Sequence, residues 1–166
     1  INLARLDIRQ EADRHTKLLN ELFRKKYKIK YNSLSEKEKI KLLNKLIKGQ
    51  NYFVDRIKIT NKENKEVWNT FKQISKTPNE CLGAYVISMT STASDILSVY
   101  FLQIQAKIKN FLRVVPLFET LDDLKNANSV MKNLFKLSWY RKMTSAKQEV
   151  MIGYSDSSKD AGKLSA

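Results

Sequence analysis

The sequence contains only one cysteine and one histidine among its 166 residues. Without a second cysteine, an internal disulfide framework and a cysteine-rich zinc site are both excluded. The isolated His15 has no neighbouring Cys or His, which favours a structural or supporting role over metal ligation or catalysis. A nearly cysteine-free chain is typical of a reducing compartment, so we expect a cytoplasmic location.

The sequence also lacks a long apolar run. Its longest uncharged stretch, residues 81–94, is shorter than the roughly 20 residues that a membrane-spanning helix needs. No basic and then apolar leader opens the chain. With 42% hydrophobic and 10% aromatic residues, we expect a soluble globular protein without a membrane partner. The chain begins at Ile1 inside a strand-like run and ends in an unfinished helical pattern, which predicts a piece of a longer protein.

Acidic residues are scarce relative to basic ones, with 17 Asp and Glu against 31 Lys and Arg and a net charge of +14. Such an excess raises the hypothesis of a basic nucleic-acid-binding module. However, the lysines are spread along the chain, without a helix-turn-helix pattern, a zinc finger or an aromatic stacking motif. A solvated helical face or a lysine-rich composition explains this spread equally well, so we expect no nucleic-acid partner.

Apolar runs with the length of strands alternate with helical patterns. The runs cover residues 3–8, 82–89, 112–118 and 149–154. Helices with apolar residues three and four apart are expected at residues 10–26, 62–75 and 121–135. Ser35 and Glu38 form a capping-box pattern before a further helix, and a helix at residues 96–109 is apolar almost all round and should be buried. This alternation favours parallel strands with right-handed crossovers, as in half of a (β/α)8 barrel or in a doubly wound sheet.

Two of the expected strands end at a carboxylate. The run 112–118 leads into Glu119 and then Thr120, a candidate helix cap, and the run 149–154 leads into Ser155 and Asp156. Ligands bind at the carboxyl ends of parallel strands, and two carboxylates there suit a hard divalent cation such as Mg²⁺ or Mn²⁺. Acidic residues are also favoured at helix starts by the helix dipole, and the spacing alone does not decide between these interpretations.

Four blocks of the sequence resemble phosphoenolpyruvate carboxylase. They are LDIRQE at residues 6–11 with the following RHT at 14–16, GAYVISM at 83–89, PLFETLDDL at 116–124, and the segment 148–166. The blocks occur in the order found in that family, whereas residues 25–76 match little beyond their helical character. The resemblance implies that residues 1–166 are a fragment of the family's catalytic barrel domain. The implied fold is α/β, a partial (β/α)8 (TIM-type) barrel with about four parallel strands and many helices.

The resemblance also implies the chemistry, a metal-dependent carboxylation of phosphoenolpyruvate with bicarbonate that yields oxaloacetate and phosphate. Glu119 and Asp156 match the family's metal-ligand positions, with Mg²⁺ or Mn²⁺ as the cofactor. Arg9 is a candidate for holding an anionic substrate, and Lys159 for neutralising charge at the same site, although a surface lysine explains Lys159 equally well. The implied partners are the two substrates, the rest of the same polypeptide and, for the full enzyme, a homotetramer.

Some parts of the family pattern are altered or missing. Ser158 stands where we expect Gly or Ala, and Lys163 stands where Arg is common. The family's catalytic histidine, its loop rich in glycine and arginine, and its later arginines match nothing in this chain. We therefore expect no carboxylase activity from this segment alone. Another barrel enzyme acting on phosphoenolpyruvate or pyruvate would share the metal-binding carboxylates but not the run 154–162.

Overall fold

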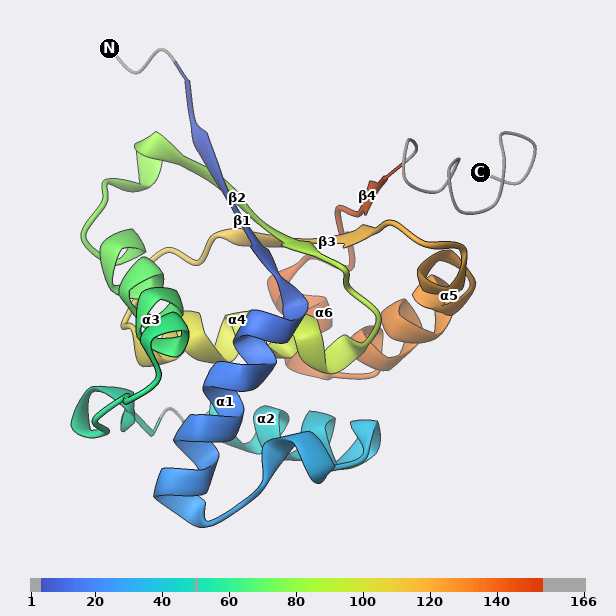
Figure 1. Cartoon of the computed structure of the whole chain (residues 1–166). Coiled ribbons are helices and arrows are strands. Elements are labelled where there is room, and N and C mark those ends of the chain that lie inside the picture. Colours follow the sequence, from blue (N-terminus) through green and yellow to red (C-terminus); the bar gives the residue numbers. More distant parts are fainter. Residues whose placement is uncertain (1–3, 50, 154–166) are drawn as a thin grey trace.

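The computed structural model describes residues 4–49 and 51–153, which form an α/β fold with four parallel strands and six α-helices (Figure 1). The strands are β1 (Leu6–Glu11), β2 (Leu82–Ser88), β3 (Arg113–Phe118) and β4 (Met151–Ile152). The helices are α1 (Ala12–Tyr27), α2 (Glu36–Gly49), α3 (Lys62–Ile74), α4 (Ala93–Gln105), α5 (Leu121–Phe135) and α6 (Ser138–Met143). None of these helices is long and apolar enough to cross a lipid bilayer.

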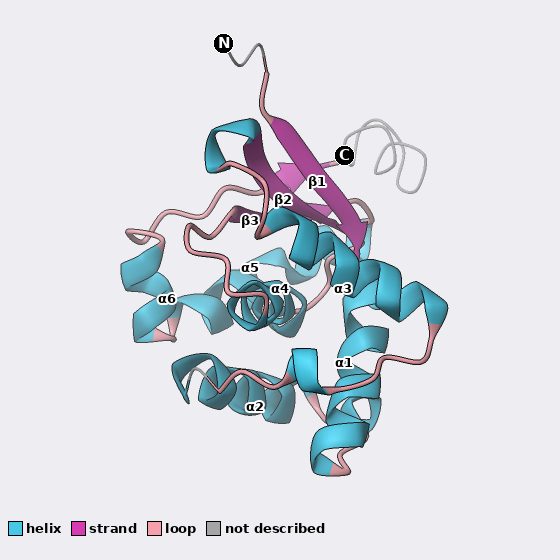
Figure 2. Cartoon of the chain, turned by 90° about the vertical axis from the view of Figure 1, so that its left-hand side faces the viewer, coloured by secondary structure: helices cyan, strands magenta, loops and turns pink. Residues whose placement is uncertain are grey.

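The strands lie in the sheet in the same order as in the sequence, β1-β2-β3-β4, and each neighbouring pair is parallel. Arg9 on β1 is in register with Val86 on β2, and Val86 is in register with Val115 on β3. The helices of the described part lie on one side of the sheet (Figure 2). The sheet therefore has one face covered by helices and one face that points away from them.

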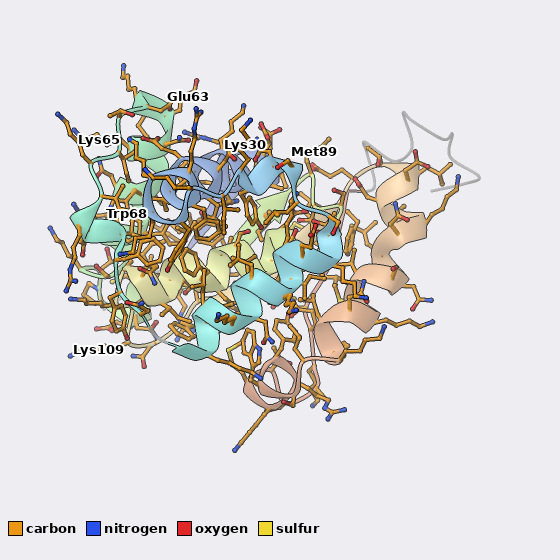
Figure 3. The ribbon with its side chains drawn as sticks, turned by 90° about the horizontal axis from the view of Figure 1, so that it is seen from below. Lys30, Glu63, Lys65, Trp68, Met89 and Lys109 are labelled. Atoms are coloured by element: carbon orange, nitrogen blue, oxygen red, sulfur yellow. The ribbon has the colours of Figure 1, made fainter. Side chains whose placement is uncertain are left out.

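The main hydrophobic core lies between the sheet and the helices. Helix α4 occupies its centre, packing against β3 and against α1, α2, α3 and α5. All 13 residues of α4 are buried, which confirms the prediction from its apolar pattern. In α3 the pattern is one-sided, since Trp68 is buried while Glu63 and Lys65 lie on the outer side of the helix (Figure 3). Helix α4 is buried all round because other elements pack against it on several sides, whereas α3 has one side that faces solvent.

The starts of the helices agree with the capping signals in the sequence. Ser35 and Glu38 form the expected box at the start of α2, in which the Ser35 N–H donates to Glu38 Oε2 at 2.8 Å. Thr120 caps α5, as predicted, by accepting the N–H of Asp123 at 3.1 Å. These caps satisfy N–H groups that have no partner within the helix.

Some expected boundaries were wrong. Strand β1 extends to Glu11 rather than ending at Arg9, because Gln10 and Glu11 also pair with residues of β2. Helix α1 consequently begins at Ala12 instead of residue 10. Helix α4 covers residues 93–105 instead of 96–109, because a capping box forms at Thr92 and Lys107 adopts a positive φ of 57° just beyond the helix end.

Strand β4 is shorter than the expected run 149–154. Only Met151 and Ile152 pair with β3, and Tyr154 lies outside the described residues. Just before this pairing, the Gln148 side chain donates to the backbone oxygen of Val114 at 2.7 Å. A side chain therefore contacts β3 at the point where a longer strand would pair through its backbone.

Candidate functional site

Glu119 lies directly after β3, at the carboxyl end of the sheet, and only 7% of its surface is exposed. Its Oε1 atom accepts a hydrogen bond from Arg9 Nη2 at 3.0 Å, and its Oε2 atom accepts one from the Met89 N–H at 2.8 Å. Arg9 lies within β1, and Met89 directly follows β2. The carboxylate is therefore held in one orientation by both β1 and the loop after β2.

Arg9 lies on the face of the sheet that points away from the helices, because it is in register with Val86, which belongs to the small buried cluster on that face. The side chain of Arg9 is 58% exposed, whereas that of Glu119 is 9% exposed. A guanidinium carries five N–H donors, so the bond to Glu119 leaves the group able to bind an anion as well. The structure thus brings together two site residues that the sequence separates by 110 positions.

Met89 was not expected at the site. It follows β2 with a φ of 54°, in the left-handed region that residues with a side chain rarely adopt. This conformation directs its N–H toward Glu119, while its side chain remains 48% exposed. The relevant group is a backbone N–H, which every non-proline residue carries, so no residue type in the sequence could have indicated it.

Gly153 brings the end of β4 next to Glu119. Its N–H donates to the backbone oxygen of Phe118 at 3.0 Å. A Cβ atom at this position would lie 3.0 Å from Glu119 Cγ, which is tighter than ordinary van der Waals contact, and 3.4 Å from its Cα. Glycine therefore allows the backbone directly after β4 to lie against the Glu119 side chain.

The other predicted site residues, Asp156 and Lys159, lie outside the described residues, as does Ser155. Within residues 4–49 and 51–153, no group of three or more His, Cys, Asp or Glu side chains could hold a metal ion. Of the two predicted metal ligands, the described residues include Glu119. Carboxylate oxygens are the ligands that hard divalent cations such as Mg²⁺ and Mn²⁺ take in proteins. Glu119 thus fits a metal site that takes its other ligands from elsewhere.

His15 lies away from this site, in the core between α1 and β2. Its Nε2 atom is 2.8 Å from the hydroxyl of Tyr85, and this hydroxyl donates to Gln10 Oε1 at 2.8 Å. Burial, reinforced by nearby Arg14, lowers the pKa of His15 to about 3 and keeps the ring neutral. This buried, neutral position agrees with the expected structural or supporting role of His15.

Comparison with known proteins gives matches along the whole chain. The model of the phosphoenolpyruvate carboxylase family matches residues 1–166. The chain is 44% identical over 166 residues to the C4 phosphoenolpyruvate carboxylase of Flaveria trinervia. It is 46% identical over 167 residues to the enzyme of Pisum sativum, and 46% identical over 166 residues to that of Enterobacter sp. (strain 638). Each alignment covers 100% of this chain but only 17% of the plant proteins and 19% of the bacterial one.

Proposed function

Because the chain belongs to the phosphoenolpyruvate carboxylase family, we propose that it supplies part of the metal and substrate site of that enzyme's catalytic barrel. The family resemblance seen in four sequence blocks is confirmed by the match over all 166 residues. The proposal concerns the full-length protein, since the chain spans less than a fifth of the length of its curated relatives. The segment alone is expected to be inactive.

The proposed fold of the complete domain is a (β/α)8 barrel, of which this chain forms about half. A doubly wound sheet reverses its strand order and carries helices on both faces. The order β1-β2-β3-β4 has no reversal, and the helices of the described part lie on one face, as a barrel requires. The opposite face, with Ala84, Val86, Val115 and Leu117, would then point into the barrel. Strands β1 and β4 would pair with the rest of the polypeptide.

The proposed reaction is the carboxylation of phosphoenolpyruvate with bicarbonate to oxaloacetate and phosphate. Glu119 and Asp156 would hold Mg²⁺ or Mn²⁺, and Asp156 follows Gly153 by three residues in the sequence. The bound ion would supply positive charge where negative charge develops on the substrate. From the family resemblance we further propose that the full enzyme is a cytoplasmic homotetramer.

Arg9 has two roles in this proposal. Its bond to Glu119 orients the carboxylate, and its remaining donors on the same face of the sheet suit the carboxylate or phosphate group of the substrate. Lys159 would add a second positive charge near Asp156. The Arg9–Glu119 contact of 3.0 Å is the observation that carries the proposal, because it joins an anion-binding group to a candidate metal ligand.

The test replaces the two acids in the full-length protein. We expect Glu119→Gln and Asp156→Asn each to weaken Mn²⁺ binding, measured by electron paramagnetic resonance, by at least about 100-fold, and to lower carboxylation by a similar factor. Glu149→Gln is the matched control, since Glu149 is also paired with an arginine, Arg113, but at the opposite end of β3. If both acid variants bound Mn²⁺ and turned over like the control, the proposed site would be wrong.

A further inference from the structure

Two helices begin beside Glu119, and both begin with the same pattern, a threonine followed three residues later by an aspartate. Thr92 and Asp95 stand at the start of α4, after β2, and Thr120 and Asp123 stand at the start of α5, after β3. In each pair the side chains and backbones bond reciprocally in a capping box. Both aspartates are buried, each with 8% of its surface exposed.

The box of α5 holds the backbone of Glu119. Asp123 Oδ2 accepts the N–H of Thr120 at 3.1 Å and that of Glu119 at 3.4 Å. Thr120 Oγ1 in turn accepts the N–H of Asp123 at 3.1 Å. Asp123 therefore holds the backbone of Glu119, and with it the starting point of the Glu119 side chain.

The box of α4 holds the loop that carries the Met89 N–H. Asp95 Oδ2 accepts the N–H of Ser91 at 3.2 Å and that of Thr92 at 2.9 Å. Thr90, in the same loop, is fully buried and is bonded to two strands. Its hydroxyl donates to the Ile87 oxygen of β2, and its N–H donates to the Leu117 oxygen of β3. With these bonds in place, the loop has little freedom to turn the Met89 N–H away from Glu119.

A third carboxylate holds the first turn of α4 from outside. Glu36, the first residue of α2, accepts the Ser94 N–H at 2.9 Å and the Ser94 hydroxyl at 2.7 Å. Helix α4 is therefore fixed at its start both by its own Asp95 and by a neighbouring helix. The loop between β2 and α4 is consequently held at both of its ends.

From these contacts we propose that Asp95 and Asp123 are positioning residues for the Glu119 carboxylate, Asp123 through its backbone and Asp95 through the Met89 N–H. This inference rests on the proposed function, in which Glu119 is a metal ligand. Residues that hold a metal ligand through hydrogen bonds typically change metal affinity about 10- to 100-fold when they are replaced. The two capping boxes would thus raise metal affinity without contacting the metal ion.

The test measures Mn²⁺ binding to the full-length protein by electron paramagnetic resonance, alongside its melting temperature. We expect Asp95→Ala and Asp123→Ala each to weaken Mn²⁺ binding by about tenfold. Asp95→Asn and Asp123→Asn should stay within about threefold of the wild type, since a side-chain amide oxygen can accept the same backbone N–H bonds, as Gln does in place of Glu at the third helical position of a capping box. Rescue by the amide separates hydrogen bonding from the charge of the aspartate.

Asn61→Ala is the matched control. Asn61 caps α3 by accepting the Asn64 N–H at 2.9 Å, and this cap makes no bond to Glu119 or Met89. The control should lose stability but keep its Mn²⁺ affinity. If an aspartate-to-alanine variant does not fold, Thr92→Val or Thr120→Val removes only the hydroxyl of the same box and should weaken Mn²⁺ binding by about threefold.

The outcomes distinguish this inference from the proposed function. If Glu119→Gln leaves Mn²⁺ binding unchanged, Glu119 is not a metal ligand and the proposed function itself fails. If Glu119→Gln weakens binding while the variants of both boxes bind Mn²⁺ like Asn61→Ala, the positioning role alone is overturned. An amide variant as weak as the corresponding alanine variant would also overturn it, because charge rather than hydrogen bonding would then be decisive.

Discussion

The two faces of the same sheet carry opposite kinds of chemistry. On the helix-covered face, Tyr85 of β2 packs in a stack on Phe71 of α3, with ring centres 5.2 Å apart, and bonds to the neutral His15. On the other face, one residue away along β2, Val86 lies in register with Arg9, whose charge is paired with Glu119. Because successive side chains of a strand point to opposite faces, one short strand can serve both a dry core and a charged site.

On the helix-covered face, a chain of uncharged polar side chains runs from Thr70 through Gln10 and Tyr85 to His15. Gln10 donates to Thr70 at 3.2 Å and accepts from Tyr85, which in turn contacts His15. Burial raises the pKa of Tyr85 and lowers that of His15, so both groups remain uncharged near neutral pH. We therefore expect substitutions on the helix-covered face to change stability, and substitutions on the face that carries Arg9 to change metal binding.

The largest expected effect is a loss of stability from a substitution in the hydrophobic core. Phe71→Ala should lower the free energy of unfolding by about 3–5 kcal/mol, because Phe71 is fully buried and its loss leaves a cavity beside Tyr85. The loss can be measured by urea unfolding of the full-length protein. Phe111→Ala is the control, since Phe111 is 40% exposed and should cost much less. Equal losses for the two variants would contradict the account of the core.

The free energy of unfolding is expected to fall by about 2 kcal/mol between pH 6.5 and pH 5 because of His15. Its pKa is about 3 in the folded chain, below the ordinary value of 6.5, so between these values the unfolded state binds a proton that the folded state does not. This contribution to stability is therefore intact above about pH 6.5 and falls by about 1.4 kcal/mol for each unit of acidification below it, toward pH 3.

The measurement compares urea unfolding of the wild type and of His15→Gln in the full-length protein at pH 6.5 and pH 5. The wild type should lose about 2 kcal/mol more than the variant over this interval, since the variant has no imidazole to titrate. Mn²⁺ affinity should respond equally to pH in the two proteins, because His15 lies on the helix-covered face. Parallel stability curves would show that His15 is not held neutral.

The smallest expected effect is on Mn²⁺ affinity and concerns Gly153, which lies beside Glu119. Gly153→Ala should weaken Mn²⁺ binding by about tenfold, because the added Cβ would press on Glu119 Cγ from 3.0 Å and shift the carboxylate. Gly49→Ala is the control, since a Cβ at that position of α2 meets nothing within 4 Å. Unchanged Mn²⁺ affinity in Gly153→Ala would show that β4 and Glu119 are less tightly packed than described.

Local signals in the sequence predicted the elements of this fold well. The helix over residues 121–135 has the bounds of α5, and the box of Ser35 and Glu38 forms as expected. Such features depend on residues within one turn of each other, so the sequence carries them directly. The end of β1 was missed, because Gln10 and Glu11 become strand only through pairing with β2, some 77 residues away in the sequence.

For the candidate site, the sequence indicates residues but not their arrangement. Glu119 and Arg9 were identified through the family motifs, yet their contact depends on the register of three strands. The patterns Thr92 to Asp95 and Thr120 to Asp123 are readable in the sequence as helix caps. That both hold the same carboxylate follows only from the parallel pairing that sets β2 beside β3.

The most direct test of the account is a crystal structure of the full-length protein with Mn²⁺, in which anomalous scattering locates the ion. We predict a single peak at the carboxyl ends of β3 and β4, with an oxygen of Glu119 and an oxygen of Asp156 each about 2.0–2.2 Å from the ion, as is usual for carboxylate oxygens on a small divalent cation. Arg9 should remain bonded to Glu119 in that structure. A peak elsewhere, or one contacted by neither acid, would contradict the central claim.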